Sequence, residues 1–246
     1  MSLVPAVHTP CPVPADFDQK AYLGVGTAAG TLANRPAWKS YASGFNGVAF
    51  RFAAADEAHD RFIEAASGEY AFALGTSARY AQETALFSFF INTLSTIECF
   101  YFALYNIGAC MNSAMFPSKT EDDLRRVSIP ETVRRFKNAY PGRPLSKRLL
   151  SVRDSEELDA LKVYRDFLTH RGTPPRGHDL GVVAYGSTVD VRKARSVTIP
   201  SNPKDVPSNW KSDLSLRPEM TAEPREWLAK TTNLLLQETE AFLQRP

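Results

Sequence analysis

The chain has 246 residues, of which 43% are hydrophobic and 23% charged, and these are the proportions of an ordinary globular protein. The formal net charge is only +2, so the overall charge does not indicate what the protein binds. Its three cysteines, Cys11, Cys99 and Cys110, cannot all pair within one chain, which argues against a disulfide framework. This cysteine content fits a reducing setting, and we expect a cytoplasmic protein.

Residues 1–40 are predicted to form an extended arm that packs on the body of the protein or on a partner, because prolines and closely spaced glycines interrupt them. Within the arm, "GVGTAAG" (24–30) fits a dinucleotide-binding fingerprint with Ala29 in the last place. That fingerprint requires a strand before it and a helix after it. Only "KAYL" precedes it and Pro36 follows soon after, so a flexible turn is preferred. The first residues also lack the basic start and apolar run of a signal peptide.

Two helices are expected next. Residues 48–66 are rich in alanine and other good helix formers. From Tyr80 to Ala114, apolar residues recur at steps of three and four and cover most faces of one long helix. Such a helix belongs at the centre of a bundle or in a dimer interface. Polar residues interrupt it and no Lys/Arg asymmetry flanks it, so we expect a buried helix and no membrane span.

The second half of the chain is predicted to be more interrupted. Residues 117–152 are predicted to form a basic connector with a short helix at 130–139. The next helix is capped by Asp154 or Ser155 and ends near Arg171, where Gly172 and two prolines follow. Residues 176–220 form an irregular insertion in which "GVVAYG" and "RSVTIP" indicate a small β-hairpin. Thr221, with Pro224 just inside, opens a last helix.

Together these elements predict one all-α domain over residues 1–246, an up-and-down bundle of four to five helices with an N-terminal arm and an insertion before the last helix. Charge is segregated along the chain. Between Leu124 and Arg153 a single acid, Glu131, stands among nine basic residues. This segment either attracts an anion or is simply a solvated basic face.

Several common catalytic motifs are missing from the sequence. It has no phosphate-binding G-x-x-x-x-G-K-[ST] and no G-x-S-x-G nucleophile elbow. It has no C-x-x-C, and no two histidines have the spacing of metal ligands on a helix. The sequence therefore indicates neither a metal site nor a cofactor.

The most informative segment is the helix end "VYRDFLTHRG" (163–172). A helical wheel separates its apolar side chains from four polar ones, which share the opposite face: Arg165, Asp166, Thr169 and His170. Asp166 and His170 are four residues apart, so the carboxylate is expected to orient the imidazole. His170 would transfer protons and Arg165 would bind phosphate. These roles suit cleavage of RNA without a metal, because the ribose 2′-OH supplies the nucleophile.

"YRDFLTHRG" resembles the motif of the HEPN superfamily, in which an arginine and a polar residue are followed a few residues later by a histidine at a helix end. Arg165, Asp166 and His170 match its positions. The resemblance implies a four- or five-helix bundle, a homodimer with a composite active site, and metal-independent endoribonuclease activity in a toxin, defence or RNA-processing system. A cognate antitoxin or other protein partner is a further implication. The RNA would be held by basic residues, which are Arg134, Arg135, Lys137, Arg171 and Arg176.

Two alternatives remain open. The spacing from arginine to histidine is close to what chance gives in this chain, and a second match, Arg171 to His178, cannot be helical because Pro174 and Pro175 interrupt it. If the motif is a chance match, His170 is a surface residue stabilised by the helix C-terminus. The protein is in that case a non-catalytic bundle that acts as an interaction module or scaffold. Glu98, in the long apolar helix, is expected to pair with a basic group, with Arg165 as one candidate.

Overall fold

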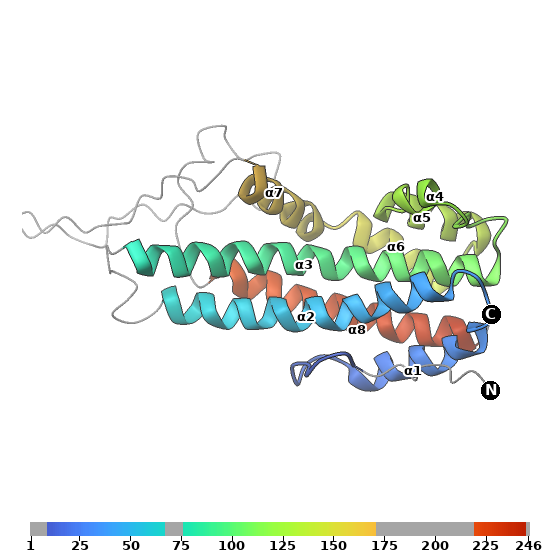
Figure 1. Ribbon diagram of the computed structural model, residues 1–246, viewed down its shortest axis with the longest axis horizontal. Coiled ribbons are helices and arrows are strands. Elements are labelled where there is room, and N and C mark those ends of the chain that lie inside the picture. Colours follow the sequence, from blue (N-terminus) through green and yellow to red (C-terminus); the bar gives the residue numbers. More distant parts are fainter. Residues whose placement is uncertain (1–8, 67–75, 171–218, 245–246) are drawn as a thin grey trace, which may run out of the picture.

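The computed structural model describes residues 9–66, 76–170 and 219–244, and within these ranges the regular structure is entirely helical (Figure 1). Eight α-helices and one 3₁₀ turn follow in chain order: α1 (Gln19–Ala29), η1 (Gly30–Leu32), α2 (Trp38–Ala66), α3 (Thr76–Met111), α4 (Glu121–Arg125), α5 (Ile129–Ala139), α6 (Pro144–Arg153), α7 (Glu156–His170) and α8 (Glu219–Gln244). The prediction of an all-helical bundle is confirmed.

The long helices α2 and α3 pack side by side in opposite directions (Figure 1). Glycines allow their backbones to approach closely. A Cβ atom at Gly44 would lie 2.8 Å from the ring of Phe102, and one at Gly47 would lie 2.9 Å from Cys99 Sγ. Farther along the pair, Arg51 Nη1 donates a hydrogen bond of 2.9 Å to Asn92 Oδ1.

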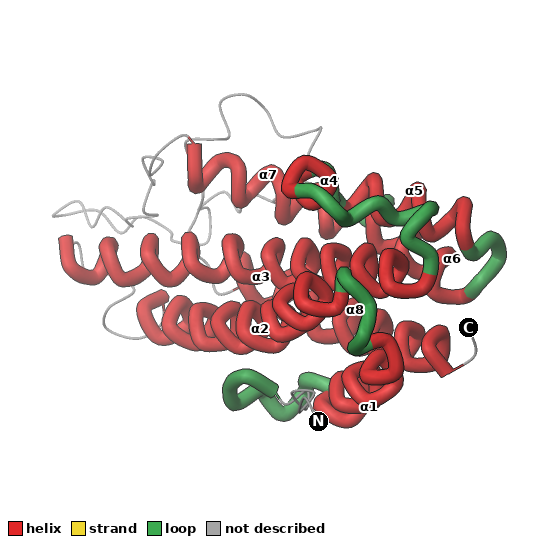
Figure 2. Tube along the Cα trace, turned by 45° about the vertical axis from the view of Figure 1, so that its right-hand side comes forward, coloured by secondary structure: helices red, strands yellow, loops and turns green. Residues whose placement is uncertain are grey.

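The remaining helices pack on part of this pair and on one another. Helix α8 lies along α2 and α3, and α1 packs on α8 (Figures 1 and 2). Helices α6 and α7 lead back along α3 as two successive segments before the chain returns through α8 (Figure 2). The core between these layers is rich in aromatic rings. Tyr22 of α1 stacks on Phe45 of α2 with ring centroids 4.3 Å apart, and such large buried side chains each stabilise the fold by roughly 1.5–3 kcal/mol.

The predicted extended arm is wrong for residues 19–40, which hold α1, η1 and the start of α2. Asp18 caps α1 by accepting a hydrogen bond of 2.9 Å from Ala21 N. Tyr22 and Val25 are fully buried at helical spacing. Gly24, expected in a flexible turn, lies inside α1, where a Cβ atom would require the carboxylate end of the Glu240 side chain of α8 to move. The backbone of Gly24 is helical, so the conformational freedom of glycine is not needed here.

The basic connector is also more ordered than expected. The predicted helix at 130–139 is confirmed as α5, but α4 and α6 flank it. Thr120 and Asp123 form a reciprocal capping box at the start of α4, and Pro144 occupies the first turn of α6. The fold therefore has more helices within the described residues than the four to five predicted.

The long apolar helix is confirmed as α3. Its part from Arg79 to Met111 is long and apolar enough to cross a membrane by length and composition, a test that core helices of soluble proteins also pass, and 56% of its most apolar window is buried inside the structure. For α7, Ser155 proves to be the capping residue, because its Oγ accepts from Leu158 N at 3.3 Å. Helix α8 begins at Glu219, two residues before the expected start. The predicted β-hairpin lies in residues 171–218, outside the described part.

Candidate functional site on α3 and α7

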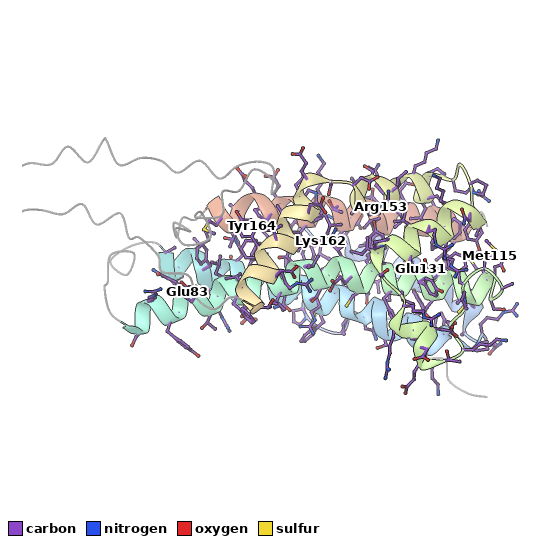
Figure 3. The ribbon with its side chains drawn as sticks, turned by 90° about the horizontal axis from the view of Figure 1, so that it is seen from above. Glu83, Met115, Glu131, Arg153, Lys162 and Tyr164 are labelled. Atoms are coloured by element: carbon purple, nitrogen blue, oxygen red, sulfur yellow. The ribbon has the colours of Figure 1, made fainter. Side chains whose placement is uncertain are left out.

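Helix α7 is fixed on α3 by its apolar side. Leu158 and Leu161 are buried, and Tyr164 stacks on Phe90 of α3 with ring centroids 4.7 Å apart. Burial raises the pKa of the Tyr164 hydroxyl to about 12, so this ring stays neutral at physiological pH. Figure 3 shows Tyr164 and Lys162 on α7 where the helix crosses α3. This docking sets the position of Arg165, the residue that follows.

Arg165 extends towards α3 between two carboxylates. Its Nε donates a hydrogen bond of 2.7 Å to Asp166 Oδ1, and its Nη1 lies 3.8 Å from Glu98 Oε1. The second distance gives an ion pair but is too long for a hydrogen bond. A guanidinium has five N–H donors, and Nε is the one that donates to another described side chain. A third of the Arg165 side chain, 33%, is exposed, so part of it is accessible to a ligand.

Glu98 is the acidic partner that the sequence suggested for Arg165. Partial burial raises the pKa of its carboxyl, and Asp166 raises it further, while Arg165 and Lys162 lower it. The same α7 face carries a second ion pair, in which Lys162 Nζ lies 3.0 Å from Asp159 Oδ1. The site is thus a half-exposed group of alternating charges along the seam between α3 and α7.

The last turn of α7 contains the remaining motif positions. The helix ends at His170, as predicted, but the His170 side chain lies outside the described part of the structure. Asp166 Oδ1 accepts a hydrogen bond from Arg165 Nε, and its predicted contact with the His170 side chain lies outside the described residues. Thr169 Oγ1 donates to the Arg165 carbonyl oxygen at 2.8 Å, so it faces its own helix. Arg171 and Arg176 lie outside the described residues.

The structure does not bring the predicted RNA-binding residues of α5 next to Arg165. Arg134 and Arg135 both pair with Glu131, at 2.6 Å and 2.7 Å, and Arg135 Nη1 also donates to the Met115 carbonyl oxygen at 2.8 Å. Lys137 is exposed. Figure 3 shows Glu131 and Met115 towards the opposite end of the molecule from Tyr164. The two arginines are partly neutralised by Glu131, which weakens one of the two alternatives for this segment, a field that attracts anions.

A second charged cluster was not predicted from the sequence. Arg225 of α8 donates from Nε to Asp56 Oδ1 at 2.6 Å and from Nη1 and Nη2 to Asp16 at 2.8 Å. Its guanidinium also lies 5.0 Å from the centre of the Phe52 ring. His59, on the turn after Asp56, is 2.9 Å from Thr221 Oγ1 through Nδ1, and burial lowers the pKa of its imidazole. The partners of Arg225 are 169 and 209 residues away in sequence, and no local motif signals such pairs.

Comparisons with known proteins add no assignment: no family model, no curated protein and no solved structure matches this chain. Among the described residues, no three His, Cys, Asp or Glu side chains gather closely enough to hold a metal ion. The local chemistry of the α3 and α7 face is therefore the basis on which a function is proposed.

Proposed function

We propose that this protein is a HEPN-like up-and-down helical bundle that cleaves RNA without a metal, in a toxin, defence or RNA-processing system. The observation that carries the proposal is the state of Arg165. Two carboxylates flank its guanidinium while a third of its side chain stays exposed, on a helix whose last residue is His170. A planar cation held in this way suits the bidentate binding of a phosphate group.

The residues divide the reaction as follows. His170 accepts the proton of the ribose 2′-OH, whose oxygen then attacks the adjacent phosphorus. The P–O5′ bond breaks, an acid returns a proton to the departing 5′ oxygen, and a 2′,3′-cyclic phosphate remains. Arg165 stabilises the charge that develops on the phosphoryl oxygens. A homodimer would supply the second histidine, because one imidazole is not both base and acid in the same step.

The test is cleavage of a mixed RNA pool by the purified protein in excess EDTA. We expect wild type to produce fragments with cyclic phosphate ends, and His170→Ala to produce none while keeping its helical circular dichroism and its oligomeric state. Thr169→Ala is the matched control, because this neighbouring hydroxyl faces its own helix. If wild type leaves all RNA intact, the proposal is wrong.

A second candidate is a non-catalytic interaction module. It is favoured by large apolar side chains that are exposed on the surface of the bundle, such as Phe50 on α2, which is 53% exposed. Failure of wild type to cut RNA, combined with loss of a protein complex in Phe50→Ala, would establish this alternative.

A further inference from the structure

One face of α3 carries a line of exposed side chains that the core does not use. Tyr80, Phe87, Ile91 and Glu98 are spaced by seven, four and seven residues, which places them within about 40° of one another around the helix. We call Tyr80, Phe87 and Ile91 the aromatic strip. The neighbouring aromatics Phe89 and Phe90, by contrast, are fully buried.

The strip is open to solvent. Tyr80 is 72% exposed and Phe87 is 42% exposed, and Ile91 is half-buried. Single exposed apolar residues are normal on protein surfaces. Two aromatic rings aligned on one helix face are a different matter, because together they form a row of π surfaces at which planar groups can stack.

The strip leads directly to the candidate site. Glu98, at its end, is the residue that pairs with Arg165. Helix α7 borders the same stretch of α3, because Tyr164 stacks on Phe90, one turn beyond Phe87. The helical rise puts Phe87 roughly 16 Å from Glu98 along the axis. A chain whose phosphate meets Arg165 would therefore have its next nucleotides over the strip.

We propose that the aromatic strip stacks the unpaired bases of single-stranded RNA next to the site at Arg165. This inference rests on the proposed function and names its substrate as unpaired rather than duplex RNA. Aromatic side chains stack readily on splayed bases, whereas a duplex keeps its bases stacked on one another and displays mainly its backbone.

The charges around Arg165 support a base-stacking mode over a purely electrostatic one. Two cations, Lys162 and Arg165, lie at this end of the strip. Three acids stand beside them, Asp159, Glu98 and Asp166. Because the acids outnumber the cations by one, binding through phosphates alone would be weak here. The affinity of the single strand is then expected to fall less steeply with salt than in proteins that neutralise many phosphates.

The test uses full-length protein carrying His170→Ala, so that RNA is bound without being cut. A fluorescein-labelled, adenine-rich oligoribonucleotide is titrated alone and after annealing to its complement. We expect Phe87→Ala to weaken single-strand binding about tenfold, which is the loss of one stacked base, and to leave duplex binding unchanged. Phe87→Trp is expected to restore binding and Phe87→Leu is not, because only the indole offers a π surface. Phe50→Ala is the matched control, since this exposed phenylalanine lies on α2.

Equal binding of single strand and duplex, or wild-type affinity of both Phe87→Ala and Phe87→Leu, would overturn the inference. Such a result leaves the proposed cleavage standing if wild type still cuts RNA in EDTA. Conversely, if the protein cuts no RNA but binds single strands through Phe87, the inference about the aromatic strip stands and the proposed nuclease activity is wrong. Circular dichroism of each variant shows that the exposed substitutions leave the bundle folded.

Discussion

Two arginines in this protein each lie between two carboxylates, and their surroundings give them opposite roles. Arg225 is 12% exposed and its Nε, Nη1 and Nη2 all donate to Asp16 or Asp56. Arg165 is 33% exposed and donates from Nε alone to a described side chain. A saturated guanidinium ties elements together, whereas an unsaturated one keeps donors for a ligand.

The location of the two arginines supports this distinction. Arg225 joins α8 to α2 and to the segment before α1, where Asn233 and Gln237 of the same helix bind Asp16 and Asp18. Its removal would disturb three parts of the fold. Arg165 joins α7 to α3 through a long ion pair, and the apolar side of α7 holds that contact independently. We therefore assign the Arg225 cluster to the stability of the fold and propose the Arg165 cluster as the functional site.

The largest expected effect is on stability at Arg225. Arg225→Ala leaves two carboxylates without their shared cation and removes a guanidinium packed on Phe52. We expect a loss of about 1.5–3 kcal/mol in the free energy of unfolding, the scale of hydrogen bonds to charged groups, because the carboxylate partners are partly exposed and solvent screens them. Urea unfolding followed by circular dichroism measures it. A loss below about 1 kcal/mol would mean that the cluster is not structural.

The next effect separates charge from shape at Arg165. Arg165→Lys keeps the positive charge but loses the planar fork, so we expect RNA cleavage in EDTA to fall by about tenfold or more. Stability is expected to change by less than about 1 kcal/mol, because the ion pairs of this half-exposed residue are largely solvated. Single-turnover cleavage and urea unfolding of the same preparation test both parts. Undiminished cleavage by the lysine variant would show that the fork is not used.

A smaller effect distinguishes the two clusters by pH. Hydrogen bonding to Arg225 holds the pKa of Asp16 below its ordinary value of 3.8. The unfolded chain therefore binds the proton more readily, and the stability from this pair is present above pH 3.8 and lost as the pH falls through the lowered value. Asp16→Asn is expected to flatten the acid limb of a stability–pH curve measured by urea unfolding. An unchanged limb would contradict the assignment.

The smallest expected effect on the free energy of unfolding is that of Glu98. Its dependence on pH has the opposite sign to that of Asp16. Burial raises the pKa of Glu98 above its ordinary value of 4.5, so its contribution favours the folded state at low pH and is lost as the pH rises through the raised value. We expect Glu98→Gln to leave stability at neutral pH within about 0.5 kcal/mol of wild type. A large destabilisation in the same urea assay would make Glu98 a structural residue like Asp56.

The sequence predicts those features of the structure that depend on residues close together in the chain, and not those that depend on residues far apart. The periodicity of α3, the Ser155 cap of α7 and the helix end at His170 are local features, and they were predicted within a few residues. The pairing of Glu98 with Arg165 was one of the options that the sequence left open, and the structure contains it.

Other features depend on distant parts of the chain. Helix α1 was predicted as part of an arm because its closely spaced glycines suggested breaks, and its packing against α8 is not visible in the local sequence. The partners of Arg225 come from segments far apart in sequence, and Arg134 and Arg135 looked available for RNA because their shared pairing with Glu131 depends on side-chain geometry. Spacing alone does not show which basic residues are already paired.

The most direct test of the account is single-turnover cleavage of single-stranded RNA in excess EDTA by wild type and by Arg165→Ala. We predict that the variant loses about 10²–10³-fold in rate, the scale seen when a donor to transition-state charge is removed, while its urea midpoint stays close to that of wild type. Cleavage by Arg165→Ala at the wild-type rate would contradict the central claim. So would a variant whose lost activity is matched by a lost fold, because Arg165 would then belong with Arg225.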